Sequence, residues 1–312
     1  MKIAVQMDNI SNINVQGDTS FALMLEAQAR EHEVFYYTPD KLSLFENQVF
    51  AHMHKIMLYD DLSNYYKLEA CKKISLNEFD VILLRQDPPF DMNYISTTYL
   101  LDFVSDNTLI LNNPFWVRNS PEKLFVMQFS EFMPKTLIAR DIKDVVEFRE
   151  QQGDIIIKPL YGNGGAGVFY LKQDDKNLNS LLEIFDKYYN EPFIVQDYLE
   201  RVVEGDKRII LIDGEAVGAI NRVPAKSELR SNMHVGGVAQ HCDITQKERE
   251  LCAVIAPWLQ KRELYLCGID IIGDKITEIN VTSPTGIREI KRFSDIDVAK
   301  IFWNKIENRL LV

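Results

Sequence analysis

Three side chains able to bind a hard cation lie close together near the end of the sequence. Asp270, Glu278 and Asn280 belong to an apolar stretch that predicts two short strands joined by a turn. If the turn has three residues, Gly273 to Lys275, Asp270 lies opposite Glu278 and both share a face with Asn280. A two-residue Gly-Asp turn, which Gly-X chemistry favours, would put the two carboxylates on opposite faces.

We favour the three-residue turn because it separates polar from apolar side chains cleanly. Its ligand face would also carry Gly268, Ile272 and Ile276, and its core face would carry Ile269, Ile271, Thr277 and Ile279. Two carboxylates and an amide on one half-apolar surface repel one another and lose solvation unless a cation joins them. Oxygen ligands in this number are typical of Mg²⁺. The alternative is a solvated outer face that carries acids by chance.

A lysine followed by a glycine-rich turn marks a second candidate site. Lys158 ends a predicted strand and precedes Gly162, Gly164 and Gly165. Glycines let backbone N–H groups approach an anion closely, and a lysine at the mouth supplies a charge for phosphate. The segment lacks the Lys-Ser/Thr of a P-loop and opens no helix, as a dinucleotide fingerprint would. The alternative is a flexible hairpin.

Other cations could complete a site for phosphate and carboxylate groups. Arg208 opens a strand and could brace a developing negative charge, and Lys123 near a helix start could add a cation over phosphates. Arg85 follows a predicted parallel strand, where a substrate carboxylate could bind. Together these groups predict a nucleoside triphosphate, a second ligand with a carboxylate, and carboxylate activation by phosphoryl transfer before attack of an amine.

A polar segment over about 224–242 has no apolar period. Arg230 and Asn232 precede Gly236 and Gly237 in it, and they could close over the substrate and exclude water. The alternative is a segment that is simply mobile.

Short apolar strands alternate with helices in the first third of the chain, which predicts an open α/β sheet. Strands are expected at 2–7, 34–37, 81–84 and 109–112, and helices at 20–31, after an Asp18 or Thr19 cap, and at 94–104. Ser120 and Pro121 would start the next helix as its N-cap and first residue.

The remaining pattern is that of mixed α+β lobes. Strands are expected at 155–158, 168–171, 193–197, 208–212 and 216–222, and helices at 177–189, 246–262 and 295–310. Asp213-Gly214 predicts a hairpin between the last two strands. We expect three units, 1–120, 121–200 and 201–312.

Bulk properties exclude several classes of function. The 312 residues carry a net charge of -11, which argues against nucleic-acid and anionic-membrane partners because both need basic patches. Met1 leads straight into a strand, without a signal peptide, and no apolar run reaches the roughly 18 residues of a membrane span. Four cysteines without C-x-x-C spacing predict free thiols in the cytoplasm. His52 and His54 have no partner spacing, and we expect a surface pair.

Several longer motifs carry a family resemblance. They are Met7-Asp8 with Asp18-x-Ser20-Phe21, Arg85-x-Asp87-Pro88-Pro89-Phe90-Asp91, Glu122-Lys123-Leu124-Phe125, Lys158-Pro159-Leu160, Gly205-Asp206-Lys207-Arg208, Asp270-Ile271-Ile272-Gly273-Asp274, and the tail from Thr277-Glu278-Ile279-Asn280 to Ile290. In these motifs the chain resembles the ATP-grasp ligases, and within them the bacterial glutathione synthetases, over essentially its whole length.

The resemblance implies a fold, a reaction and a set of roles. ATP would lie between two α+β lobes, and glycine would be ligated to the cysteinyl carboxylate of γ-glutamylcysteine through an acylphosphate, with release of ADP and phosphate. Arg208 and Asn280 would act in catalysis, and Asp270, Glu278 and Asn280 would hold Mg²⁺, with Mn²⁺ as a substitute. ATP would contact Lys123, Lys158, Gly162, Gly164, Gly165, the adenine edge Gln196, Asp197, Tyr198 and Leu199, and Asp206, which would meet the ribose or fix Arg208. The dipeptide would contact Arg85, Arg230, Asn232, Gly236, Gly237, Ser283 and Arg288. The resemblance also implies a cytoplasmic homotetramer.

Three positions depart from the family pattern. Tyr161 stands where Asp is usual, Ser231 where Gly is usual, and Val238 where Arg is usual. They leave open another ATP-grasp ligase with a different amine or peptide, and a nucleotide-binding protein without turnover.

Overall fold

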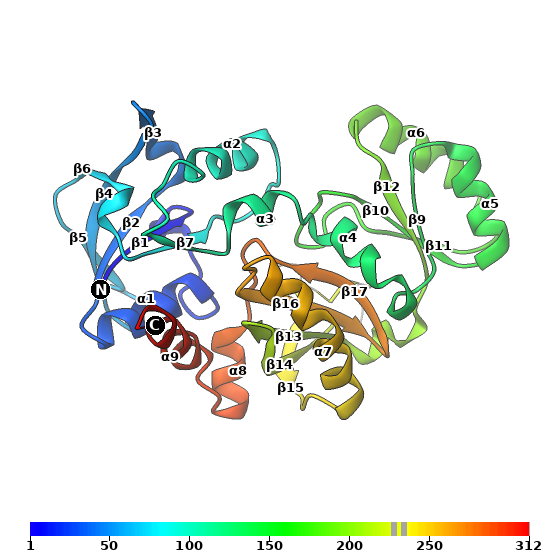
Figure 1. The fold of residues 1–312 in the computed structure, drawn as a ribbon. Helices are drawn as coiled ribbons and strands as arrows, with labels where there is room; N and C mark the ends of the chain where they lie inside the picture. Colours follow the sequence, from blue (N-terminus) through cyan, green and yellow to red (C-terminus); the bar gives the residue numbers. More distant parts are fainter. Residues whose placement is uncertain (226–229, 232–235, 312) are drawn as a thin grey trace.

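Three β-sheets and the helices that cover them make up the computed structural model, which describes residues 1–225, 230–231 and 236–311 (Figure 1). The N-terminal sheet consists of β1 (Lys2–Met7), β2 (Glu33–Tyr37), β3 (Leu42–Phe45), β4 (Gln48–Leu58), β5 (Tyr66–Leu68), β6 (Lys72–Ser75), β7 (Val81–Arg85) and β8 (Leu109–Leu111). Its order is β3-β4-β2-β1-β7-β8, with β5 and β6 also paired to β4. β2, β1, β7 and β8 are parallel, which confirms the predicted open α/β sheet.

Strands β3 to β6 form an antiparallel extension that the sequence did not predict. Its longest strand, β4, buries Val49, Ala51 and Met53 at alternate positions, as a strand with one covered face should. His52 and His54 alternate with these buried residues and lie on the other face of the strand. There the His54 Nδ1 lies 2.8 Å from the carbonyl oxygen of Glu69. Neither histidine lines the cavity described below.

The C-terminal helices return to the N-terminal sheet. α1 (Thr19–Ala29) is capped by Asp18, whose side chain accepts a hydrogen bond from Phe21 N. α8 (Ile287–Ser294) and α9 (Val298–Leu310) lie beside α1 in Figure 1, and Trp303 on α9 donates a 2.8 Å hydrogen bond to the carbonyl oxygen of Leu23. α8 is a helix that the sequence did not predict. The two ends of the chain are therefore packed on one side of the molecule.

The four-stranded sheet is antiparallel, in the order β11-β10-β12-β9. It is made of β9 (Thr136–Ala139), β10 (Ile155–Pro159), β11 (Phe169–Leu171) and β12 (Phe193–Asp197), with α5 (Ile142–Gln152) and α6 (Leu178–Tyr188) over one face. Ile155 and Ile157 pack toward these helices, and the alternate residues Ile156 and Lys158 line the cavity on the other face.

The five-stranded sheet is also antiparallel, in the order β15-β14-β13-β16-β17. It contains β13 (Asp206–Ile212), β14 (Glu215–Val223), β15 (Val238–His241), β16 (Leu266–Ile272) and β17 (Lys275–Asn280), and α7 (Gln246–Lys261) packs on it. Asp213 and Gly214 both have positive φ, 53° and 77°, which confirms the predicted hairpin. The long polar segment contains β15, so its prediction as a loop throughout is wrong.

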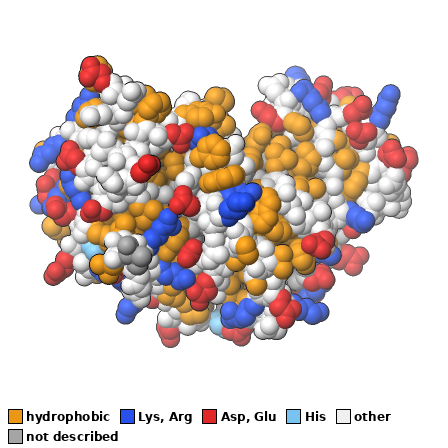
Figure 2. Space-filling view, viewed as in Figure 1, with side chains coloured by type: hydrophobic (Ala, Val, Ile, Leu, Met, Phe, Trp, Pro, Cys, Tyr) orange, Lys and Arg blue, Asp and Glu red, His pale blue; other side chains and the backbone are white. Residues whose placement is uncertain are grey.

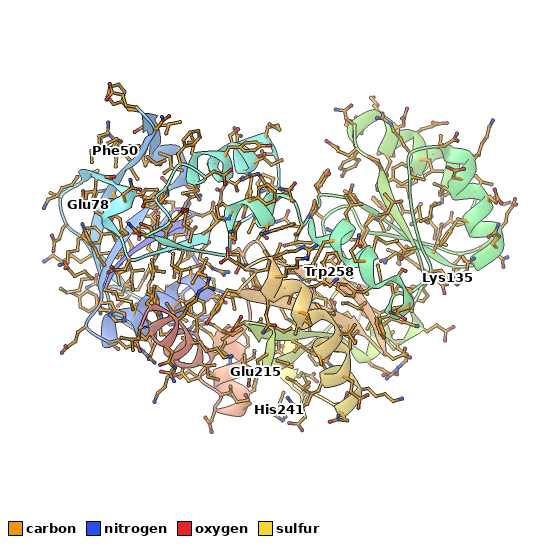
Figure 3. All side chains as sticks on the ribbon, viewed as in Figure 1. Phe50, Glu78, Lys135, Glu215, His241 and Trp258 are labelled. Carbon is orange, nitrogen blue, oxygen red and sulfur yellow. The ribbon has the colours of Figure 1, made fainter. Side chains whose placement is uncertain are left out.

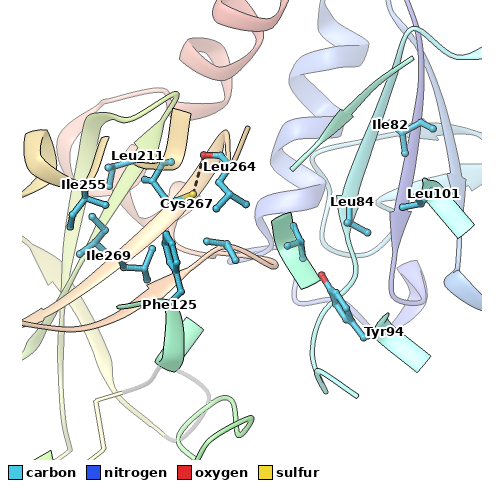
Figure 4. Close-up of a cluster of buried hydrophobic side chains, with 14 of the residues drawn as sticks. Ile82, Leu84, Tyr94, Leu101, Phe125, Leu211, Ile255, Leu264, Cys267 and Ile269 are labelled. Carbon is cyan, nitrogen blue, oxygen red and sulfur yellow. Dashed lines mark hydrogen bonds between the residues drawn. The ribbon is translucent and has the colours of Figure 1, made fainter. Parts of the chain in front are cut away.

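A shared hydrophobic cluster joins the N-terminal sheet to the five-stranded sheet. Figure 4 shows Ile82, Leu84 and Tyr94 of the N-terminal part, Ile269 of the five-stranded sheet, and Phe125, which lies outside both sheets, in one close-up. The other short helices are α2 (Met92–Leu101), α3 (Pro114–Arg118) and α4 (Glu122–Phe125).

The start of α4 differs from its prediction. Pro121 occupies the N-cap position, and Ser120, predicted as the cap, has a buried hydroxyl without a hydrogen-bond partner among the described residues. α4 is held instead by aromatic packing, because the Phe125 ring lies 5.5 Å from that of Trp258 on α7 (Figure 3).

The outer surface fits the acidic composition. Figure 2 shows acidic and basic side chains interspersed on one face, and a notch between the N-terminal sheet and the four-stranded sheet. No helix in the described part of the chain has both the length and the apolarity needed to cross a membrane.

Candidate active site

A cavity of about 800 Å³ is lined by residues of the four-stranded and five-stranded sheets and by the loops that follow β1 and β7 of the N-terminal sheet. Most of the predicted site residues lie in its wall: Lys123, Lys158, Gly162, Gly164, Gly165, Gln196, Asp197, Tyr198, Leu199, Asp206, Arg208, Arg230, Asp270, Glu278, Asn280 and Ser283. Residues scattered over more than half of the sequence are thus brought together around one space.

The hairpin that carries the predicted metal ligands has an unpredicted geometry. β16 and β17 are joined by the two-residue turn Gly273-Asp274, with Gly273 at φ 66°, so the predicted three-residue turn is wrong. Asp270 nevertheless pairs with Glu278, and Gly268 pairs with Asn280. Both can hold because the register shifts after Asp270, which leaves Thr277 as an extra residue in β17.

This β-bulge also places the two residues before Glu278 on the opposite faces from those predicted. Ile276, predicted on the ligand face, is fully buried in the core with Ile271 and Ile279, whereas Thr277, predicted in the core, lines the cavity. The Thr277 hydroxyl donates a 3.3 Å hydrogen bond to the carbonyl oxygen of Asp270. The bulge therefore keeps both carboxylates on the cavity face and the isoleucines in the core.

Four charged side chains from three neighbouring strands form a buried network. Arg208 lies opposite Asp270, and Asp206 lies opposite Arg222, in the pairing of β13 with β16 and β14. The Arg208 guanidinium donates to both Asp270 oxygens at 2.8 and 2.7 Å. Arg222 Nη2 lies 2.6 Å from Asp206 Oδ2 and 3.0 Å from Asp270 Oδ2. Asp206 thus fixes Arg222 rather than Arg208, which had been one of its two predicted roles.

The network separates the pKa values of its two carboxyl groups. Burial alone would raise the pKa of Asp270, but Arg208 and Arg222 outweigh it and hold the pKa well below its usual range. Burial raises the pKa of Asp206 to about 6, against the opposing charge of Arg222. Asp206 Oδ2 also accepts a 3.0 Å hydrogen bond from Ser231, and its buried Oδ1 has no partner among the described residues.

Two lysines flank Glu278 on the cavity wall. The Glu278 Oε1 lies 3.4 Å from Lys158 Nζ and 3.8 Å from Lys123 Nζ. Burial would raise the pKa of Glu278, but the two ammonium groups hold it below its usual range, and burial lowers the pKa of Lys158. Lys123 also donates a hydrogen bond to the carbonyl oxygen of Gly162, which ties it to the glycine-rich turn.

The glycine-rich turn needs glycine for its backbone conformation. Gly164, Gly165 and Gly167 have φ of 60°, 80° and 70°, values that residues with a side chain rarely adopt. Arg230, from the polar segment predicted to close over the substrate, donates a 3.3 Å hydrogen bond to the carbonyl oxygen of Gly165. The turn thus covers one side of the cavity with backbone groups.

The predicted adenine edge consists of the last two residues of β12 and the two that follow it. Its residues 196–199 all line the cavity. Two backbone N–H groups of this edge already donate hydrogen bonds within the protein. Asp197 N–H donates to the carbonyl oxygen of Lys135 and Tyr198 N–H to that of Asp154, both at 3.0 Å.

Several predicted substrate residues lie away from the cavity wall. Arg85 is 4% exposed and donates to Ser20 Oγ at 3.0 Å and to the Pro284 carbonyl oxygen at 2.9 Å. Arg288 pairs with Asp60 at 2.8 Å on the outside. Gly236 and Gly237 are not part of the wall, and Asn232 lies outside the described residues.

Several wall residues were missed by the sequence analysis, among them three charged ones, Arg222, Glu122 and Glu289. Arg222 is 2% exposed in the wall, Glu289 is 5% exposed, and Glu122 is partly buried. The position of Arg222 at the end of an apolar strand was a usable signal, because a charge on a core-facing strand position needs a partner. Glu122 and Glu289 had no such signal, since each stands on a helix whose buried face the sequence alone does not define.

The donor set fits magnesium and a triphosphate. Asp270, Glu278 and Asn280 supply only oxygen ligands, and Asn280 Nδ2 lies 3.2 Å from Asp270 Oδ2, which leaves its Oδ1 as an acceptor. Lys123, Lys158 and Arg208 stand beside them and match the charge of phosphate groups. Within the described residues no three His, Cys, Asp or Glu side chains gather as a metal site. Mg²⁺ is usually held by one or two carboxylates together with water and phosphate oxygens.

Comparison with known proteins agrees with this geometry. The family "Prokaryotic glutathione synthetase, N-terminal domain" matches residues 1–118, and "Prokaryotic glutathione synthetase, ATP-grasp domain" matches residues 122–295. The glutathione synthetase of Mesorhizobium japonicum is 57% identical over 309 residues, which cover 99% of both chains.

Solved structures support the fold at low sequence identity. The D-cycloserine synthetase DcsG is 14% identical, with a TM-score of 0.71 over 99% of this chain and 100% of that one. The ATP-grasp ligase PsnB, complexed with its minimal precursor, Mg and ADP, is 15% identical, with a TM-score of 0.62 over 100% of this chain and 98% of that one. With two family matches that span nearly its whole length, the chain belongs to the prokaryotic glutathione synthetases of the ATP-grasp superfamily.

Proposed function

We propose that this chain ligates glycine to γ-glutamylcysteine at the expense of ATP. The cysteinyl carboxylate takes the terminal phosphoryl group of ATP, and the glycine amine then displaces phosphate to form the new peptide bond. ADP, phosphate and glutathione are the products. The family membership supports this reaction, and the cavity supplies the groups that it needs.

The observation that carries the proposal is the position of Glu278 between two lysines and opposite Asp270. A phosphate group that enters the cavity would take Lys123 and Lys158 as partners, and Glu278 would then be free to bind a cation. Glu278 and the two lysines would therefore have partners before the substrate arrives and different ones afterwards. A bound Mg²⁺ would neutralise charge on the phosphate oxygens.

Arg208 is our candidate for stabilising the reacting phosphoryl group. Asp270 fixes its guanidinium through two hydrogen bonds, and Thr285 Oγ1 lies 3.4 Å from its Nη1. A cation held rigidly before the reaction stabilises developing charge without the cost of reorganisation. Asn280, hydrogen-bonded to the same carboxylate, would complete this group.

Asp206 and the edge 196–199 would bind the nucleoside. Asp206 lies in the cavity wall, and its Oδ1, which has no partner among the described residues, could accept a hydrogen bond from a ribose hydroxyl. Ser231 ties the same carboxylate to the segment that carries Arg230, so nucleoside binding and closure of that segment would be linked.

Ser283 and Arg230 are our candidates for direct contact with the dipeptide, because both line the cavity. Arg85 would act from behind the wall, where it holds Pro284 next to Ser283. Asn232, Gly236, Gly237 and Arg288 keep their proposed roles as contacts of the dipeptide.

The chain would work as three units, 1–120, 121–200 and 201–312, with one sheet in each. We further propose a homotetramer, on family resemblance, which a measurement of solution mass would test. Four free cysteines support a reducing compartment such as the cytoplasm. Mn²⁺ should replace Mg²⁺ because both accept oxygen ligands.

Phosphate release measured with ATP, Mg²⁺ and γ-glutamylcysteine tests the function directly. We expect glycine to stimulate release far more than alanine, glutamate or no amine. A different preferred amine would indicate another ATP-grasp ligase, and no release with any amine would indicate a nucleotide-binding protein without turnover. Either result would overturn the proposal.

A further inference from the structure

Glu289 stands out among the carboxylates of the cavity wall. Its side chain is 7% exposed, and Oε2 has no hydrogen-bond partner among the described residues. Oε1 lies 3.8 Å from the Arg292 guanidinium, on the outer side of α8. A buried carboxylate oxygen without a partner is costly, so its place in a cavity wall indicates a ligand that donates to it.

Gly17 leaves space directly in front of this carboxylate. A Cβ on Gly17 would lie 3.1 Å from Glu289 Oε1 and 3.7 Å from Asn14 Nδ2, and all three residues line the cavity. Asn14 Oδ1 accepts from the backbone N–H of Gln16, which turns its NH₂ group away from that contact. The result is a small cradle with a negative acceptor on one side and a neutral donor on the other.

The rest of this end of the cavity favours a positively charged group. Asp8 and Asp18 also line it. Arg85 is buried behind the wall and bonded to Ser20 and Pro284. Arg288 and Arg292, whose charges act on Glu289, do not line the cavity either. A ligand with an ammonium group would offset the acidic charge, whereas a ligand with anionic groups alone would be repelled.

We propose that the cradle of Gly17, Asn14 and Glu289 binds the α-amino acid head of the γ-glutamyl residue. The ammonium group donates to the Glu289 carboxylate, whose Oε1 faces the cradle, and the adjacent carboxylate accepts from Asn14 Nδ2. Only a γ-linked glutamyl residue presents both groups together at the end opposite the cysteinyl carboxylate. This inference rests on the proposed function and adds to it the basis of selectivity for the γ-glutamyl group.

The glycine substrate is the other source of an ammonium group. Its nitrogen has to reach the cysteinyl carbon, beside Arg208. The Thr285 hydroxyl lies 3.4 Å from Arg208, and Glu289 stands four residues further along the chain, within α8. The ammonium of γ-glutamylcysteine lies seven bonds from the cysteinyl carbon, roughly 9 Å when extended. The longer reach matches the dipeptide better than glycine.

Two peptides that differ only in this ammonium group test the inference. The kcat/KM for phosphate release, with glycine present, is measured for γ-glutamylcysteine and for N-glutarylcysteine, which lacks the α-amino group. The wild type should prefer γ-glutamylcysteine by about 10- to 100-fold, as expected for one hydrogen bond to a charged group. In Glu289→Gln this preference should fall close to one, with the KM for glycine unchanged.

Gly17→Ala is the second variant, because its methyl group fills the cradle and leaves the charge of Glu289 unchanged. It should also lower kcat/KM for γ-glutamylcysteine more than for N-glutarylcysteine. Arg292→Gln is the matched control on α8, and it should keep the wild-type preference. Equal losses for both peptides in Glu289→Gln, a change in the KM for glycine alone, or a wild type that does not discriminate would each overturn the inference. Absence of wild-type activity with γ-glutamylcysteine would instead overturn the proposed function.

Discussion

Replacing Asn112 with alanine should destabilise the protein by about 4 kcal/mol. Asn112 is 4% exposed and follows β8 of the N-terminal sheet. Its Nδ2 donates to the carbonyl oxygens of Leu266 at 2.8 Å and Val281 at 2.7 Å. Its Oδ1 accepts from the backbone N–H groups of Tyr265 at 2.7 Å and Leu266 at 2.8 Å.

The magnitude follows from these four contacts. Each internal hydrogen bond contributes about 1 kcal/mol. Alanine would leave the two backbone N–H groups and two carbonyl oxygens that bond Asn112 buried without a side-chain partner. The loss is a large fraction of the roughly 5–15 kcal/mol by which a folded protein is stable. Because Val281 follows the candidate ligand Asn280, the same change should also weaken magnesium-dependent turnover.

Urea denaturation followed by circular dichroism measures the effect. Asn113→Ala is the neighbouring control: its side chain caps α3 and bonds Glu263 at the surface, and its loss should cost about 1 kcal/mol. Asn112→Asp keeps the acceptor contacts but faces two carbonyls with a carboxylate, so it should be less destabilising at pH 4 than at pH 7. An Asn112→Ala protein as stable as Asn113→Ala would refute the reasoning.

Three further changes have definite expected results. Gly205→Ala should cost at least about 2 kcal/mol, because Gly205 has φ 123° and a Cβ would lie 2.1 Å from Asn221 Oδ1; an unchanged denaturation midpoint would contradict this. Burial raises the pKa of Asp206 from about 3.9 in the unfolded chain to about 6, so the native state binds more protons in this window. Stability therefore falls as pH rises from about 4 to about 6, and wild type should lose up to about 3 kcal/mol relative to Asp206→Asn over that range; parallel stability curves would exclude the shift. Glu278→Gln should lower magnesium-dependent phosphate release at least about 100-fold, and a near-normal rate at ordinary Mg²⁺ concentration would remove Glu278 from the metal site.

Those parts of the fold that depend on local patterns were predictable. The apolar run of β7 and the Asp213-Gly214 hairpin are examples, since burial on both faces and a positive-φ pair each have a sequence signature. The extension β3 to β6 had a signature too, because Val49, Ala51 and Met53 alternate, but its polar outer face obscured it.

The candidate site depends on features that local patterns do not determine. The bulge at Thr277 satisfies two preferences that looked exclusive, the two-residue turn and the pairing of Asp270 with Glu278. An extra residue in a strand leaves no mark in the sequence. Arg222 joins the site only because β14 pairs with β13, which is a feature of the tertiary structure. The residue types of the candidate metal ligands were therefore predictable. The ion pairs by which the fold neutralises their charges in the free protein were not.

Oxygen-isotope transfer tests the central claim most directly. γ-Glutamylcysteine labelled with ¹⁸O in the cysteinyl carboxylate is incubated with the enzyme, ATP, Mg²⁺ and glycine, and the released phosphate is analysed by mass spectrometry. If the carboxylate takes the terminal phosphoryl group of ATP, one ¹⁸O atom should appear in each phosphate as the peptide forms. Unlabelled phosphate accompanying peptide formation would contradict the account.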